Sequence, residues 1–471
     1  MLRPWEVEIE WNQNDAQALY MQIADYFIEV IKNGKLKSGD ALPGSRPLAE
    51  SLKVNRNTVV KALDVLLAEG WLVSKERKGT FVAEVLPEEE HFTTLKRNIE
   101  VPEESVQKAT LVFDDGVPDS RLAPMTELVR AYRQIFNRKA RWQLMGYANA
   151  LGDLEFRNAM VQMLNFKRSM SIAAHEICIT RGSQMAMYLT AHCLLKKGDV
   201  VLVESPGYKP AWKALESAGA ILIPIAVDKE GLVIQEVITA LQQHKGIKAI
   251  YVTPHHQYPT TVTMSLQRRQ QLIELSNKHV FTIIEDDYDN EFHFGYRPIL
   301  PISSHANIQN YVYLGTLSKI VAPALRIGYL VSNPEFIEKI SQLRKIIDVQ
   351  GDTIMEQAVL HLIQEGGVKR HLKKATAIYK HRRDHFGKLL QEHLKEKVTY
   401  TKPEGGLAYW IVPNATVEVL QIADELEKRG IMIIKSDKFS FDTPVKGFRL
   451  GYASLTEDQM KEGIMALAGL L

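Results

Sequence analysis

The stretch from Tyr311 to Val331 constrains the fold of this chain more than any other. An apolar run ends in Gly-Thr-Leu-Ser-Lys, a loop follows, and Arg326 precedes a second apolar run. Lys319 therefore lies between two predicted strands, with hydroxyls before it and an arginine after it. A lysine that forms an imine with an aldehyde cofactor needs partial desolvation and phosphate-binding groups nearby. Taken alone, this stretch would more often contain an ordinary surface lysine in a loop, because most lysines are solvated.

A second apolar run ends in a group of acids. Residues 280–284 are apolar and predict a buried parallel strand, which is followed by Glu285, Asp286, Asp287, Tyr288 and Asp289. In open α/β sheets, ligands bind at this end of the strands. A carboxylate there can pair with a protonated pyridine nitrogen, and a tyrosine can hydrogen-bond a phenolate oxygen. An acidic pair by itself is by default a loop or a helix cap.

Residues 15–83 have the pattern of a winged helix-turn-helix, which is a DNA-binding fold. The pattern predicts helices over about 15–33, 46–52 and from Asn55 or Arg56 to Gly70, then two short strands around a basic hairpin. Residues 32–83 hold ten basic and five acidic side chains, on a chain whose net charge is only +2. A trihelical module of this kind can also be structural or protein-binding.

In such a motif the start of the second helix enters the major groove of DNA. We therefore expect Arg56, Asn57, Thr58 and Lys61 to contact bases or phosphates, and Arg46 to contact the DNA backbone. In the wing, Arg77 and Lys78 are expected to contact the minor groove or phosphates. Which base each side chain reads is not determined by the sequence.

The rest of the chain is expected to form a linker and an α/β domain. Residues 84–110 are acidic, contain prolines and lack periodicity, so they are predicted to be an extended, mobile linker. From residue 111 to residue 471, apolar runs alternate with amphipathic helices, which indicates an α/β domain. We expect one long helical stretch from Glu335 to about Leu394 and a small α/β subdomain over about 395–471.

These motifs together resemble a known family. Ser-Lys at position 319, followed by Arg326 and preceded by Asp286 and Tyr288, resembles the fold-type I pyridoxal 5'-phosphate (PLP) enzymes of the aspartate aminotransferase superfamily. With the N-terminal module, the whole chain resembles the MocR subfamily of GntR transcriptional regulators, in which a winged helix-turn-helix (α+β) is joined by a linker to an aminotransferase-like α/β domain. The GntR likeness rests on Leu42-Pro43, Arg46, Leu48-Ala49, Val54, Arg56, Thr58-Val59 and Glu69-Gly70.

The resemblance assigns roles around the cofactor. Lys319 would carry PLP covalently, Asp286 would keep its pyridine nitrogen protonated, and Tyr288 would contact its O3' oxygen. The phosphate would be bound by Gly182, Ser183, Gln184, Thr316, Ser318 and Arg326. A glycine and polar residues at a helix start, as at 182–184, form only a weak anion motif by themselves, and a plain N-cap is commoner.

Further residues follow from the same resemblance. His256 and Gln257 lie in the Thr-Pro-x-His-Gln-x-Pro-Thr loop that contacts the ring, with Thr261 where the family usually has glycine. Tyr208 would pack on the ring or line the substrate side, Tyr147 would act on the partner subunit's cofactor, and Arg449 would bind a carboxylate. The alternative interpretations are an ordinary core tyrosine for Tyr147, a loop tyrosine packed on the core for Tyr208 and a salt-bridged strand arginine for Arg449. We expect no metal site.

Three functions fit these residues. The first is a homodimeric regulator that binds double-stranded promoter DNA and senses PLP, γ-aminobutyrate, taurine or another amino compound, with weak or no transaminase turnover. The second is a working aminotransferase with an accessory DNA-binding module, and the third is a scaffold that binds no cofactor. The two cysteines form no CxxC pattern, no signal peptide is evident, and the apolar runs are too short for a membrane span, so we expect a cytoplasmic protein.

Overall fold

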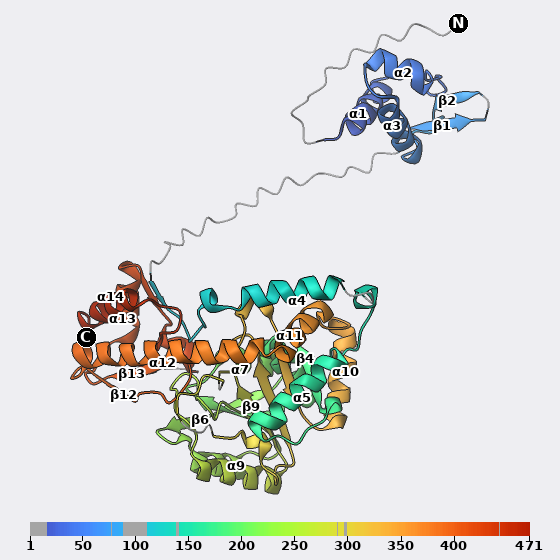
Figure 1. Ribbon diagram of the computed structural model, residues 1–471. Coiled ribbons are helices and arrows are strands. Elements are labelled where there is room, and N and C mark those ends of the chain that lie inside the picture. The colour runs from blue at the N-terminus through green and yellow to red at the C-terminus, as the bar shows by residue number, and fades with distance from the viewer. Residues whose placement is uncertain are drawn as a thin grey trace. The chain divides into compact units, whose positions relative to one another are not determined.

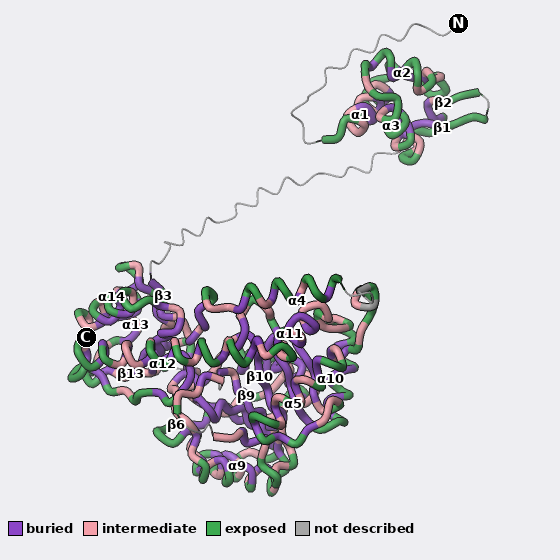
Figure 2. Tube along the Cα trace, in the orientation of Figure 1, coloured by how far each residue is buried: buried purple, intermediate pink, exposed green. Residues whose placement is uncertain are grey.

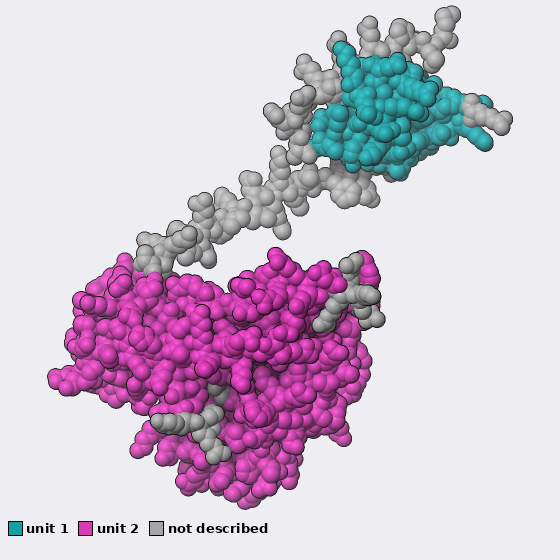
Figure 3. All heavy atoms as spheres, viewed as in Figure 1, with its two compact units in different colours: residues 1–104 teal, residues 105–471 magenta. Residues whose placement is uncertain are grey.

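The computed structural model describes residues 17–76, 78–87, 111–137, 141–289, 291–295, 299–441 and 443–471. Its chain divides into two compact units, residues 1–104 and 105–471 (Figure 3). Most of the expected linker, residues 88–110, lies outside the described residues, as does Arg77 of the expected wing. Each unit is described here by itself.

The first unit consists of three helices and a hairpin. Its elements are α1 (Leu19–Lys32), α2 (Ser45–Leu52), α3 (Arg56–Ala68), β1 (Leu72–Lys75) and β2 (Gly79–Val82), with the two strands antiparallel. Ile23 and Phe27 of α1 and Val59 and Leu66 of α3 are fully buried in its core. This arrangement is the winged helix-turn-helix that the helical periodicity predicted.

An eight-stranded sheet organises the second unit. The strand order is β4-β11-β10-β9-β8-β5-β6-β7, and the five strands from β10 to β6 run parallel (Figure 1). The strands are β4 (Ile177–Thr180), β5 (Val200–Ser205), β6 (Ile221–Asp228), β7 (Gly231–Leu232), β8 (Ile247–Val252), β9 (Thr282–Asp287), β10 (Tyr311–Thr316) and β11 (Gly328–Val331).

Helices cover both faces of this sheet. Because side chains alternate along a strand, Val201 and Val203 of β5 face the core shared with α6, α7 and α10, whereas Leu202 faces the core shared with α8 and α9. Figure 2 shows the central strands as buried between exposed helices. The helices are α4 (Met125–Asn137), α5 (Leu154–Arg168), α6 (Ser183–Leu194), α7 (Lys209–Ser217), α8 (Ile234–Gln243), α9 (Leu266–His279), α10 (Pro334–Ile347), α11 (Thr353–Gln364), α12 (Gly367–Leu394), α13 (Val419–Lys428) and α14 (Glu457–Ala468).

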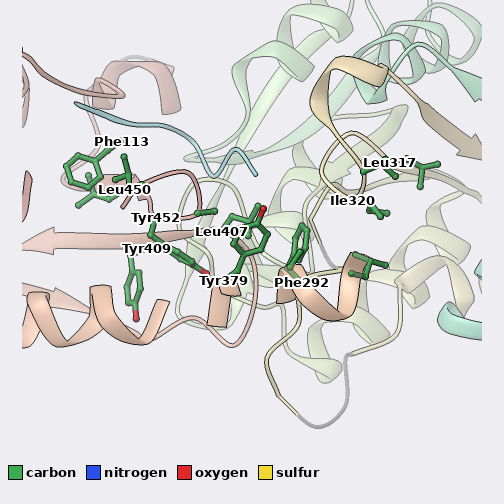
Figure 4. Packing of buried hydrophobic residues seen from close by; sticks show 14 of the residues in the cluster. Phe113, Phe292, Leu317, Ile320, Tyr379, Leu407, Tyr409, Leu450 and Tyr452 are labelled. Atoms are coloured by element: carbon green, nitrogen blue, oxygen red, sulfur yellow. The ribbon is translucent and has the colours of Figure 1, made fainter. Parts of the chain in front are cut away.

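Two small sheets lie beside the large one. One has the order β12-β13-β15 (Val398–Tyr400, Ala408–Pro413 and Phe448–Gly451), and the other pairs β14 (Ile431–Ile433) in parallel with β3 (Leu111–Phe113). The first strand of the unit thus belongs with its C-terminal elements. Figure 4 shows how Phe113, Leu450 and Tyr409 pack in the core that continues toward Leu317.

The expected helical stretch from Glu335 to about Leu394 consists of three separate helices, α10, α11 and α12. Val349 has a positive φ of 62°, and Gly366 adopts the left-handed conformation with a φ of 69° before α12. Both conformations end a right-handed helix.

Candidate functional site

A cavity of about 190 Å³ lies at the carboxyl ends of the central strands. Asp286 near the end of β9 and Lys319 just after β10 both line it, because neighbouring parallel strands end at the same edge of the sheet. The residues expected from sequence that also line it are Ser183, Tyr208, Tyr288, Thr316, Ser318 and Arg326; Asp115, Val117, Pro118, Tyr251, Thr253, Tyr258 and Pro323 complete the lining.

Lys319 is held at the cavity by its ammonium group. Nζ donates a hydrogen bond of 3.1 Å to the carbonyl oxygen of Gly116 and lies 4.6 Å from the ring centroid of Tyr288. Gly116 belongs to the turn after β3, so this contact joins the first segment of the second unit to the loop that carries Lys319.

Asp286 is a buried carboxylate with one occupied oxygen. The Tyr251 hydroxyl donates to Oδ2 at 2.8 Å, whereas no described residue hydrogen-bonds to the buried Oδ1. Burial raises the pKa of Asp286 to about 7, the hydrogen bond from Tyr251 opposes that rise, and Lys319 also lowers the pKa. A cationic N–H donor placed in the cavity against Oδ1 would satisfy this atom and favour its charged form.

The opposite end of the cavity suits an anion. Ser318 Oγ is buried and has no hydrogen-bond partner among the described residues, and Arg326 lies beside Gly182, the N-cap of α6. A Cβ on Gly182 would lie only 2.5 Å from Arg326 Nη2, and Gly182 has a φ of 81°, so glycine is required there. N–H groups at the start of a helix, a hydroxyl and a guanidinium are groups that can together bind a phosphate.

Two of the expected phosphate ligands have side chains with other partners. Thr316 Oγ1 donates to the Ile327 carbonyl at 3.1 Å and accepts from the Ser318 N–H at 3.1 Å, so it shapes the loop that carries Ser318. The Gln184 side chain turns away from the cavity and donates to the Pro210 carbonyl at 3.1 Å.

Arg449 lies buried behind the cavity and is 1% exposed. Its Nε donates to the Asp115 carbonyl at 3.1 Å, Nη1 donates to the Pro259 carbonyl at 2.9 Å, and Nη2 lies 3.4 Å from the Tyr288 hydroxyl. The guanidinium also stacks 4.7 Å from the ring centroid of Tyr258. Arg449 retains N–H donors beyond these bonds, since a guanidinium has five.

Tyr288 lines the cavity, with its hydroxyl turned toward the loop behind it. The hydroxyl donates to the His256 carbonyl at 2.9 Å. Burial raises the pKa of Tyr288 well above its ordinary value, so the phenol stays protonated at neutral pH.

The structure does not bring the side chains of His256 and Gln257 to the cavity. His256 Nδ1 pairs with Asp289 at 2.7 Å, and Gln257 Nε2 donates to the carbonyls of Pro206 and Tyr258. Thr253 and Tyr258 of the same loop line the cavity instead. Histidine and glutamine therefore hold the loop, because their polar groups are buried and need partners inside it.

Thr261 has the left-handed conformation, with a φ of 63°. That conformation favours glycine, which is the residue the resemblance places there.

Tyr208 and Tyr147 lie in different surroundings. Tyr208 lines the cavity and packs edge-on against Tyr258 with ring centroids 5.1 Å apart. Tyr147 is 93% exposed and does not line the cavity of its own chain.

Sequence reasoning missed two buried polar residues near Asp286, of which Tyr251 contacts it directly. Tyr251 lies in the apolar run of β8, and Glu204 follows the apolar run of β5 as Asp286 follows that of β9. Glu204 Oε2 accepts hydrogen bonds from the N–H and the hydroxyl of Thr253 at 3.0 and 2.6 Å. Burial raises the pKa of Glu204 to about 7. A polar residue within or just after a buried strand was the available signal for both.

The first unit presents a basic surface at the start of α3. Asn55 caps this helix by accepting from the Asn57 N–H at 2.9 Å, and Arg56 Nε lies 3.3 Å from Ser45 Oγ at the start of α2. Among the expected DNA-binding residues, Thr58 is half-buried, Lys61 contacts the Tyr20 ring at 6.0 Å, and the exposed ones are Arg46, Arg56, Asn57, Lys61 and Lys78. No helix in the described residues is long and apolar enough to cross a membrane.

The two units define a class of protein: a winged helix-turn-helix fused to a PLP-type aminotransferase fold. The cavity fits PLP, since a buried orphan carboxylate oxygen, a lysine amine and a phosphate site occur together in it. Residues 112–467 match the class I and II aminotransferases, and residues 19–82 match the bacterial regulatory proteins of the gntR family. The chain therefore belongs to the class I and II aminotransferase family, which is PLP-dependent, and it carries a GntR-type DNA-binding domain.

Similar proteins share this architecture. The chain is 27% identical to the probable rhizopine catabolism regulatory protein MocR of Rhizobium meliloti, covering 95% of this chain and 93% of that protein. It is 26% identical to the HTH-type transcriptional regulator YdeL of Bacillus subtilis, over 95% and 96% of the two chains. The second unit resembles the kynurenine aminotransferase of Pyrococcus horikoshii, with a TM-score of 0.72 and 28% identity over 77% of this chain and 91% of that chain. The architecture is that of the MocR-type regulators.

Proposed function

We propose that this protein is a cytoplasmic transcription regulator whose aminotransferase-like unit binds PLP at Lys319 and responds to an amino compound. The observation that carries the proposal is the buried Oδ1 of Asp286, which has no described partner and lies in the same cavity as Lys319. The GntR-type unit on the same chain supplies the DNA-binding output.

When bound, PLP supplies an electron sink for bonds at the carbon that carries the amine. Asp286 provides the charge that holds a pyridinium, and Tyr251 keeps that carboxylate oriented. Ser318, Arg326 and the N-terminus of α6 bind the phosphate. Lys319 holds or releases a proton at Nζ, and Arg449 binds a carboxylate with its remaining donors.

We propose a homodimer in which Tyr147 completes the cavity of the partner chain. Tyr147 is almost fully exposed, and exposed apolar side chains occur both in its own segment, at Met145, and around the end of α10, at Ile346 and Val349. The Ala148 N–H donates to Gln350, which joins the two loops that carry these side chains. Exposed apolar clusters of this kind are typical of interaction sites. Sedimentation of the Ile346→Glu variant tests this: we expect monomers where the wild type forms dimers.

The sensing proposal is tested by the visible absorbance of the full-length protein with PLP. We expect an absorbance band that is lost in Lys319→Ala, that shifts when an active amine is added, and that shifts together with the affinity for promoter DNA. Absence of a band at every added PLP concentration contradicts the role of Lys319. A shifted band with unchanged DNA affinity contradicts the sensor.

A working aminotransferase is the second candidate, and the buried Arg449 beside Tyr288 favours it. This enzyme would convert an amino donor and an oxo-acid with turnover. Accumulation of product oxo-acid beyond one equivalent per site supports it, and formation of at most one equivalent supports the sensor.

A further inference from the structure

Asp115 lines the cavity, and its carboxylate takes no part in holding the turn after β3. The neighbouring Asp114 holds this turn, with Oδ1 accepting from the N–H groups of Gly116 and Val117 at 2.8 Å and Oδ2 accepting from Ser454 at 2.7 Å. The Asp115 side chain is half-buried and lines the cavity, yet no hydrogen bond or ion pair within the described residues occupies its carboxylate.

The position of Asp115 is fixed from both sides by the site. Its own carbonyl accepts from Arg449 Nε at 3.1 Å, and the next carbonyl, that of Gly116, accepts from Lys319 Nζ at 3.1 Å. The backbone that carries this carboxylate is therefore bonded both to the lysine that would react with an amine and to the arginine that would bind a carboxylate.

Tyr208, Tyr258 and Tyr288 line the same cavity as this carboxylate. Burial raises the pKa of Tyr208 to about 12, and the charges of Asp286 and Asp115 add to that rise. Asp115 also contributes to the raised pKa of Tyr258 and of Tyr288, although burial is the main cause in both. A carboxylate among aromatic faces is a setting that stabilises a cation, through charge-assisted hydrogen bonding and cation–π attraction.

We propose that the amino compound recognised by this cavity carries a second cationic group, such as the terminal ammonium of a basic amino acid, and that Asp115 binds it. The inference rests on the proposed function of the cavity and names the ligand class. A neutral side chain would remove water from Asp115 without replacing its hydrogen bonds, and an acidic one would meet a like charge.

The test is a spectral titration of full-length, PLP-loaded protein with L-lysine and with L-norleucine, which has the same chain length and no terminal ammonium. We expect L-lysine to half-saturate the spectral change at a concentration at least about tenfold lower, the scale of one charge-assisted hydrogen bond. In Asp115→Asn, this ratio should fall to near one, with an unchanged thermal midpoint.

Two further variants sharpen the test. Asp115→Glu extends the carboxylate by one methylene, so the preferred ligand should become the shorter L-ornithine. Glu365→Gln removes an exposed charge at the end of α11 and should leave the ratio unchanged. If both ligands act equally on the wild type, or if Asp115→Asn keeps the preference, the inference is overturned while the sensing cavity stands. If no amine changes the spectrum of the wild type, both the inference and the proposed function fail.

Discussion

The hydroxyl of Tyr251 donates a 2.8 Å hydrogen bond to Oδ2 of Asp286, a residue that lines the cavity, and leaves the buried Oδ1 of that carboxylate without a described partner. The two residues lie on the neighbouring strands β8 and β9. One side chain thus orients the other, and it favours the charged form that a pyridinium requires.

Tyr251→Phe should therefore weaken PLP binding. Loss of the donor raises the pKa of Asp286 further above about 7, so a larger fraction of the carboxyl is protonated near neutral pH. We expect the Kd for PLP to rise about tenfold near pH 7, and to approach the wild-type value near pH 9, where Asp286 is ionised in both proteins. Spectral titrations across this range measure it.

Tyr400→Phe is the matched control, because within the described residues this hydroxyl makes one weak hydrogen bond, to the Gly387 carbonyl at 3.5 Å, in the C-terminal part of the unit. An equal loss in both variants, or a Tyr251→Phe defect that is the same at every pH, would contradict the role of Tyr251.

Glu204→Gln should stabilise the PLP-free protein at high pH. The folded protein keeps a proton on Glu204 up to about pH 7, whereas the unfolded chain loses it near the ordinary pKa of 4.5. Folding is thus penalised increasingly between these values, and fully above pH 7. A glutamine oxygen can still accept from Thr253. We expect the variant to gain on the order of 1–3 kcal/mol in urea unfolding near pH 8 and to gain nothing near pH 4.

The exposed Glu365→Gln gives the baseline for that comparison, since it removes a charge from the surface of the same unit. A Glu204→Gln variant that is less stable than wild type near pH 8 would mean that the carboxylate stabilises the loop in its charged form.

Gly182→Ala should abolish phosphate recognition. The new Cβ would lie 2.5 Å from Arg326 Nη2, so the guanidinium must leave its place at the start of α6. We expect PLP to bind at least about tenfold more weakly, while binding of pyridoxal, which lacks the phosphate, changes little.

Gly246→Ala is its control. Gly246 also has a positive φ, of 77°, but its Cβ would have no heavy atom within 4 Å. This variant should lose about 1 kcal/mol of stability from backbone strain and keep its affinity for PLP. A similar loss of PLP affinity in Gly182→Ala and Gly246→Ala would mean that backbone strain, and not displacement of Arg326, weakens PLP binding.

Arg56→Ala should weaken binding to promoter DNA by about 1–3 kcal/mol and reduce the salt dependence of binding by about one counterion. Arg56 is exposed at the start of α3. Lys461→Ala removes an equal charge from exposed α14 of the other unit and should leave DNA affinity unchanged. Fluorescence anisotropy at several salt concentrations measures the DNA affinity of both variants. Equal losses of affinity would mean that the total charge of the chain, and not the position of Arg56, determines binding.

The strands that carry Lys319 and Asp286 were predictable because buried parallel strands appear as continuous apolar runs, and the ends of adjacent strands converge. The helix periodicity of the first unit was equally informative. The breaks at Val349 and Gly366 were not predicted, although Gly351-Asp352 and Gly366-Gly367 are residues of the kind that end or begin helices.

Tyr251 carried a signal, as a polar residue in a buried strand, but its contact with Asp286 could not be predicted. Its hydroxyl meets Asp286 through the pairing of β8 with β9, which a single sequence does not specify. His256 and Gln257 were assigned to the cavity from a motif, and the loop turns their side chains away from it.

The pairing of β3 with β14 has a mechanical consequence. Leu111, the first residue described in the second unit, lies only five positions before Gly116, whose carbonyl holds the Lys319 ammonium. A ligand that removes the Lys319 ammonium from this contact frees the Gly116 carbonyl. Gly116 lies close in sequence to the segment that leads from the DNA-binding unit. A change in the bonding of the Lys319 nitrogen can therefore alter the turn after β3, only a few residues along the chain from the segment that leads from the first unit.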